Sequence, residues 1–163
     1  RRCDQPFLVS QEPYPDGSLS DPYVMYPVSR HQLSYLIQGP IRESFTEALS
    51  CFKSRAYTAA AIMCRRTLEG VCAEHQAKGG NLVAKLKDLN SRGIIESGLY
   101  EWADELRIAG NDAAHEVTRT VSKEDASDMI EFSHALVEYL FTYRNRFEEF
   151  QKRRGRTPGG TAP

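Results

Sequence analysis

Tyr57-Thr58-Ala59-Ala60-Ala61-Ile62-Met63-Cys64 is a run of apolar or small residues with almost no polar face. A helix that is apolar nearly all round packs against neighbours on several sides. We therefore expect this run to open a central helix that extends from about Ala56 to Ala77, where Gly79-Gly80 ends it. A central helix of this kind predicts a helical bundle.

Helical spacing of apolar residues continues on both sides of the central helix. A helix that begins near Pro40 precedes it, and a short helix capped by Asn81 follows it. A fourth helix runs from about Ser97 to His115, and Ser122-Lys123-Glu124-Asp125 resembles a capping box that opens the last helix. The residues expected on the buried faces are Ile41, Phe45, Ala48, Leu49, Phe52, Leu82, Leu86, Leu89, Leu99, Trp102, Ala103, Leu106, Ala109, Ala126, Met129, Ile130, Ser133, Val137, Leu140, the stem of Arg144, and Phe147.

The two ends of the chain differ from this helical part. Residues 1–28 contain five prolines with tyrosines between them, a density that precludes a helix and predicts an extended Pro/Tyr-rich N-terminal arm. Residues 151–163 hold four basic side chains followed by Thr-Pro-Gly-Gly, and we expect a basic flexible tail there. The predicted fold of residues 29–150 is all-α, an antiparallel bundle of about five helices in one domain.

Composition and charge exclude several classes of protein. The 163 residues carry a formal net charge of −1, which argues against a nucleic-acid coat or a polybasic membrane surface. No apolar run approaches the about 20 residues of a membrane span. Neither a disulfide framework nor a metal-ligand spacing links Cys3, Cys51, Cys64 and Cys72, so we expect reduced thiols, a cytoplasmic location, and no metal or cofactor.

The segment Leu106–His115 carries the most informative polar residues. Arg107, Asn111 and His115 fall within an arc of about 80° on one helix face. Such a set can bind and polarise a phosphate, or it can be a buried polar network that holds helices in register. Gly110 allows a backbone or a ligand to approach closely, and Asp112 can select the tautomer of a nearby imidazole.

A second polar group, Arg65-Arg66-Thr67-Leu68-Glu69, interrupts the central helix just past its most buried turns. At least one arginine must enter or border the core, and a buried guanidinium needs a partner. Glu69 stands at i+4 from Arg65 and i+3 from Arg66. One reading is an internal ion pair, and the other is an arginine that points into a cleft shared with His115.

These two motifs, Ala59–Gly70 and Leu106–His115, resemble in their order and spacing the bacterial domain-of-unknown-function family four-one-four-five. The resemblance covers roughly residues 40–145, and it implies an HEPN-like helical bundle. The HEPN superfamily includes metal-independent RNases of toxin–antitoxin, restriction and anti-phage systems, together with non-catalytic RNA-binding or assembly modules. Some members of the family carry an N-terminal Cys-pair knuckle, and the arm that contains Cys3 is expected to be a remnant of one.

The resemblance also implies roles for individual residues. HEPN RNases carry an Arg-polar-x-x-x-His motif, which Asn111 and His115 match, while Gly110 stands where the arginine belongs. Transfer of the roles makes His115 the acid/base and Asn111 its orienting group, with Arg107 and Arg66 on the phosphate. The expected catalytic set is therefore His115, Asn111 and Arg107, and the expected binding set is Arg65, Arg66, Glu69, Gly110 and Asp112.

Three classes of function remain open from the sequence. The first is an HEPN-like module of a bacterial defence or restriction-type system that binds RNA or a nucleotide, with a metal-independent endoribonuclease using His115 as its enzymatic form. The second is an interaction domain that forms a homodimer or docks onto a larger nuclease or effector. The third is a sensor of a small molecule or signal nucleotide. The near-neutral net charge favours the second class, because RNA binding usually requires a basic surface.

Overall fold

A computed structural model describes residues 8–20, 23–26, 31–115 and 120–155. Contacts between Cα atoms divide the chain into two compact units, residues 1–32 and residues 33–163. Each unit is described by itself below.

The first unit contains a pair of short antiparallel strands, β1 (Leu8–Ser10) and β2 (Tyr23–Tyr26). Val9 pairs with Val24, and an isolated bridge between Pro13 and Leu19 closes the connecting segment. The extended conformation predicted for this arm is thus paired into a hairpin. Cys3, on which the knuckle prediction depends, lies outside the described residues.

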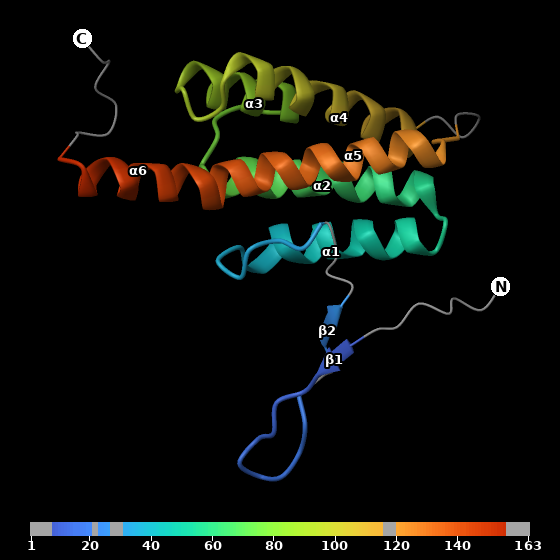
Figure 1. The fold of residues 1–163 in the computed structure, drawn as a ribbon. Helices are drawn as coiled ribbons and strands as arrows, with labels where there is room; N and C mark the ends of the chain where they lie inside the picture. The colour runs from blue at the N-terminus through green and yellow to red at the C-terminus, as the bar shows by residue number, and fades with distance from the viewer. Residues whose placement is uncertain (1–7, 21–22, 27–30, 116–119, 156–163) are drawn as a thin grey trace. The chain divides into compact units, whose positions relative to one another are not determined.

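The second unit is helical, and its elements follow the order predicted from the sequence (Figure 1). The element bounds are α1 (Gly39–Lys53), α2 (Tyr57–Glu74), α3 (Leu82–Ser91), α4 (Ser97–His115), α5 (Lys123–Glu138), η1 (Tyr139–Tyr143) and α6 (Arg144–Arg153). The central helix α2 contacts four others, α1, α3, α4 and α5, so the prediction of an all-α domain with five packed helices is confirmed.

Local capping chemistry explains where several helices begin. Pro40 occupies the first turn of α1, where its missing N–H costs no hydrogen bond. The Asn81 side chain accepts a hydrogen bond from the backbone N–H of Ala84, 2.9 Å away, at the start of α3. The Ser122 hydroxyl accepts from the N–H of Asp125 at 3.0 Å and donates to the Asp125 carboxylate at 2.7 Å. All three predicted starts are confirmed.

The core lies around α2, as its composition predicted. Ala60, Ala61, Cys64, Leu68 and Cys72 are all fully buried. Burial raises the pKa of each of the two thiols to about 11, so both stay protonated and unreactive at neutral pH.

The last helix contains a feature that the sequence did not predict. Residues Tyr139–Tyr143 form a π-helical segment between α5 and α6. Its i→i+5 hydrogen bonds rotate every following residue relative to a regular α-helix. Phe147, predicted to continue the buried stripe, is instead 58% exposed. Among the described helices and strands α6 contacts only η1, so Phe147 has no neighbouring helix to bury it, while Arg144 at the start of α6 donates to the Ile94 carbonyl at 2.9 Å. Helix α6 continues to Arg153, into the segment predicted as a flexible tail.

A hydrogen-bonded clamp holds the segment that leads into α1. Arg42 donates from Nε to the Ile37 carbonyl at 2.6 Å, and from Nη2 to the carbonyls of Leu33 at 3.0 Å and Ser34 at 2.5 Å. The buried Glu138 carboxylate accepts from the Ser34 N–H at 2.5 Å. The clamp thereby seats Leu33 and Ile37 in the core, where both are buried.

Among the described residues, no helix is long and apolar enough to cross a membrane.

Candidate functional site

Helices α2 and α4 are in close contact at Gly110. A Cβ atom built on Gly110 would lie 2.6 Å from the Cβ of Arg65 and 3.1 Å from the carbonyl oxygen of Ala61. Both distances are shorter than ordinary van der Waals contact. Gly110 is buried, so the close approach that the sequence predicted here is that of a neighbouring helix.

Arg65 spans this contact between the two helices. Its Nε lies 3.5 Å from the Glu69 carboxylate, and its Nη1 donates to the carbonyl of Arg107 at 3.2 Å. The Arg65 side chain is 23% exposed, whereas that of Glu69 is 51% exposed. The expected ion pair therefore forms, but it lies at the edge of the core rather than inside it.

Arg107 is occupied by a partner on its own helix. Its Nε donates to the Asp104 carboxylate at 2.6 Å, and both side chains are mostly buried. Charge-assisted hydrogen bonds of this length are among the stronger ones in proteins. The guanidinium that sequence reasoning assigned to a phosphate is thus neutralised within α4.

The remaining candidates do not converge with these arginines. His115 is exposed at the last position of α4, Asn111 is half-buried one turn earlier, and Arg66 is exposed on α2. None of these three forms a hydrogen bond or ion pair within the described ranges. The structure therefore brings Arg65, Glu69, Arg107 and Gly110 together at the α2–α4 contact and leaves His115 apart from them.

A cleft of about 430 Å³ lies between α4 and α5, on a different face of α4 from the Gly110 contact. Leu106, Ile108, Met129 and Phe132 are among its apolar lining residues. Four carboxylates also line it, those of Glu105, Asp112, Asp125 and Asp128, and among the described lining residues there is no Lys, Arg or His. Asp112 thus lines this cleft, whereas Arg65 and Arg107 lie at the α2–α4 contact.

An exposed aromatic pair adjoins this cleft. The rings of Trp102 and Phe132 stack with centroids 5.3 Å apart, and the residues are 44% and 38% exposed. The prediction that Trp102 is buried in the core is wrong, because the ring lies on the outer side of α4 against Phe132. The cleft was missed by sequence reasoning. The sequence signals it only through acidic residues that share a face within each helix. These are Glu105 with Asp112 on α4 and Asp125 with Asp128 on α5.

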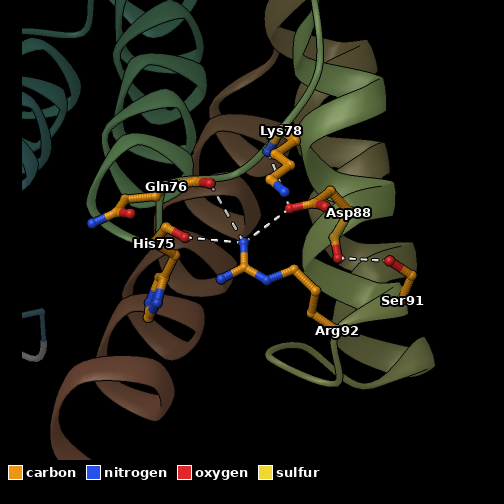
Figure 2. A network of polar contacts seen from close by, with 6 residues as sticks. All are labelled: His75, Gln76, Lys78, Asp88, Ser91 and Arg92. Atoms are coloured by element: carbon orange, nitrogen blue, oxygen red, sulfur yellow. Dashed lines mark hydrogen bonds and ion pairs between the residues drawn. The ribbon is translucent and has the colours of Figure 1, made fainter.

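A separate polar network ties the end of α2 to α3 (Figure 2). Arg92 donates from Nη1 to the carbonyls of His75 and Gln76, at 3.1 and 3.5 Å, and to the Asp88 carboxylate at 2.9 Å. The Asp88 carboxylate also accepts a hydrogen bond from the Lys78 backbone N–H. This bond, together with the hydrogen bond and positive charge of Arg92, lowers the pKa of Asp88. The cation satisfies carbonyls at a helix C-terminus, which is a structural role.

His75, at the edge of this network, should make stability depend on pH. Its ring packs on Phe141, with centroids 5.2 Å apart, and burial together with the nearby Arg144 lowers its pKa below 6.5. Below about pH 6.5 the unfolded chain therefore binds a proton at His75 more readily than the folded chain does. The contribution of the neutral His75 ring to stability is fully present above that pH and is lost as the pH falls further. We expect the melting temperature of the native protein to fall more between pH 7.5 and 5.5 than that of His75→Phe. Equal losses in thermal unfolding would contradict this role.

Metal chemistry finds no support in the part of the chain that the structure describes. No group of three or more His, Cys, Asp or Glu side chains there is placed to hold a metal ion. The three cysteines within these residues, Cys51, Cys64 and Cys72, are free thiols.

Comparison with known proteins gives one match. A family model described as "Domain of unknown function (DUF4145)" matches residues 46–153. No curated protein and no solved structure gives a significant match. The matched range contains α2 to α6 and therefore both the α2–α4 contact and the acidic cleft.

Proposed function

This chain belongs to the DUF4145 family, and we propose that it is a cytoplasmic interaction module that binds a protein partner in the acidic cleft between α4 and α5. Its HEPN-like character and a place in a bacterial defence or restriction system are part of this proposal. They are supported by the order of the two motifs that contain Arg65 to Glu69 and Asn111 to His115.

The cleft is the observation that carries the proposal. Its four carboxylates repel phosphate groups, so it is poorly suited to RNA or to a nucleotide. Its apolar wall and the adjoining Trp102–Phe132 pair are suited to apolar side chains of another protein. Carboxylates beside an apolar wall favour a partner that carries basic residues next to its apolar ones. A basic amphipathic helix has this chemistry.

The state of two of the three candidate arginines favours binding over catalysis. Arg65 and Arg107 are both engaged within the domain, by Glu69, a backbone carbonyl and Asp104, whereas Arg66 is exposed on α2. Stabilising a pentavalent phosphate requires a cationic group that is free to face it. Within the described residues, no arginine contacts His115.

A binding experiment with two probes tests this function. The probes are a fluorescein-labelled helical peptide of leucine and lysine, unrelated to this chain, and a labelled single-stranded RNA. We expect the peptide to bind and the double variant Glu105→Lys/Asp128→Lys to weaken its binding by about tenfold or more, because rim charges set such contacts. Both acids are exposed, so the variant should fold. A peptide with glutamate in place of lysine is the matched probe and should not bind.

The opposite result would favour the endoribonuclease. RNA cleavage without metal that leaves 2′,3′-cyclic phosphates, and that is lost in a folded His115→Ala variant, would replace the interaction module with an enzyme. Peptide binding that survives the Glu105→Lys/Asp128→Lys change would place the docking surface elsewhere.

A further inference from the structure

Helix α6, together with the last residue of η1, carries an apolar stripe that nothing in the described structure covers. Tyr143, Phe147 and Phe150 are 58%, 58% and 46% exposed. At about 100° per residue they lie within an arc of about 60°. Since α6 contacts only η1 among the described elements, this stripe has no partner within them. Three aromatic side chains aligned on one face are typical of a protein-binding surface.

Basic residues border this aromatic stripe. Arg146 and Arg153 project along one side of it, and the Arg154 guanidinium lies 5.7 Å from the centroid of the Phe150 ring. Arg144, on the other side, is already engaged by Glu148 at 3.6 Å and by the Ile94 carbonyl at 2.9 Å. The acidic residues of α6, Glu148 and Glu149, fall toward the opposite face. Two such stripes paired with each other would bring arginines together. The surface that complements α6 is therefore apolar with an acidic border.

The cleft between α4 and α5 has this complementary chemistry. Its wall includes Ile108 and Phe132, and its carboxylates are Glu105, Asp112, Asp125 and Asp128. An aromatic stripe with basic borders would place Phe147 and Phe150 against the apolar wall and its arginines near the carboxylates. Opposite potentials on facing surfaces of this kind give both specificity and orientation.

A chain cannot fill its own cleft with its own α6. Helices α5, η1 and α6 follow one another without a break, and Phe147 comes nineteen residues after Asp128. At 1.5 Å per residue this helical rod separates the two by about 28 Å. The stripe and the cleft can meet only between two molecules.

We propose that α6 of one copy of this chain docks into the α4–α5 cleft of a second copy, with the second copy returning the same contact. This inference rests on the proposed function of the cleft and names its occupant. Two reciprocal contacts related by a two-fold axis form a closed dimer.

Charge reversal on each side, and on both together, tests the contact. We expect the native protein to sediment as a dimer. Arg146→Glu/Arg153→Glu and Glu105→Lys/Asp128→Lys should each raise the dimer dissociation constant by about tenfold or more, because each brings like charges together. The chain with all four substitutions should return to near the native value, since the charges are opposite again. Lys87→Glu/Lys152→Glu changes the net charge as much as Arg146→Glu/Arg153→Glu does, on exposed positions outside both surfaces, and should leave the dissociation constant unchanged.

The four reversed positions are exposed and form no ion pair or hydrogen bond within the described residues, so the variants should keep the native fold, which circular dichroism checks. A native protein that stays monomeric up to about 100 μM would overturn the inference, as would a dimer that neither reversal weakens or that the combined variant fails to restore. If the dimer contact failed these tests but the unrelated leucine–lysine peptide still bound the cleft, the proposed function would stand. Only α6 of a second copy would then be rejected as the occupant of the cleft. Failure of peptide and dimer alike would overturn both.

Discussion

Replacing Gly110 by valine should lower the free energy of unfolding by about 3 kcal/mol. Its Cβ would lie 2.6 Å from the Cβ of Arg65 and 3.1 Å from the carbonyl oxygen of Ala61. Neither atom is the free end of a flexible side chain, so α2 and α4 would have to move apart. The higher helix propensity of valine offsets well under about 1 kcal/mol of this cost. Urea denaturation of Gly110→Val and the native protein measures the difference.

A second glycine of the same helix provides the matched control. A Cβ added to Gly98 meets nothing within 4 Å. Gly98→Ala should therefore stabilise the domain by up to about 1 kcal/mol, through helix propensity and a less flexible unfolded chain. If Gly110→Val were as stable as the native protein, the close contact between α2 and α4 would not exist in solution.

Removing the guanidinium of Arg42 should cost about 2–3 kcal/mol of stability. Arg42→Met keeps the length of the stem but leaves three carbonyls, those of Leu33, Ser34 and Ile37, without their charged donor. The segment that seats Leu33 and Ile37 in the core then loses its attachment to α1. Lys87→Met, which removes an exposed charge of the same sign from α3, is the control and should change stability by about 0.5 kcal/mol or less.

The readout for Arg42→Met is again urea denaturation, complemented by hydrogen exchange of the amides in residues 33–38. We expect these amides to lose protection before the rest of the domain does. The Ser34 amide should change most, because its hydrogen bond to the Glu138 carboxylate forms only while the segment stays seated on the helices. Unchanged exchange in this segment would show that the buried side chains alone hold it in place.

The candidate polar residues of the two motifs do not meet in one site, and this changes how the motifs are understood. The first motif contributes Arg65 and Glu69 to the contact between α2 and α4, and Gly110 of the second motif makes that contact close enough to form. Much of the motif pair is therefore explained by helix packing. The chemistry that a partner would recognise lies in the acidic cleft, which the second motif lines only in part, and in the aromatic stripe that runs along α6.

Features that depend on neighbours within about four residues were predictable from the sequence. The caps at Asn81 and Ser122, the first-turn proline at Pro40 and the central position of α2 all followed from local spacing and composition. The ion pair of Arg65 with Glu69 was one of the two readings that the sequence left open, and its i,i+4 spacing is what made it foreseeable.

The rotation of α4 against its neighbours was decided only by the tertiary structure. The sequence places Arg107, Asn111 and His115 on one face, but it does not show that Gly110 turns toward α2 while Asp112 turns toward α5. The same limit explains the exposure of Trp102. Periodicity identifies which residues share a helix face, whereas contacts between distant segments determine what that face meets.

The sequence by itself determined that this chain forms a helical bundle around α2, because apolar spacing and capping act within single helices. The tertiary structure decided where its chemistry lies. Helix α6 has no neighbouring helix beside it, so Phe147 is exposed, and the packing of α4 on α2 gave the Arg65 guanidinium the Arg107 carbonyl as its partner. These outcomes depend on long-range contacts, since the burial of a side chain is set by segments that lie tens of residues away along the chain.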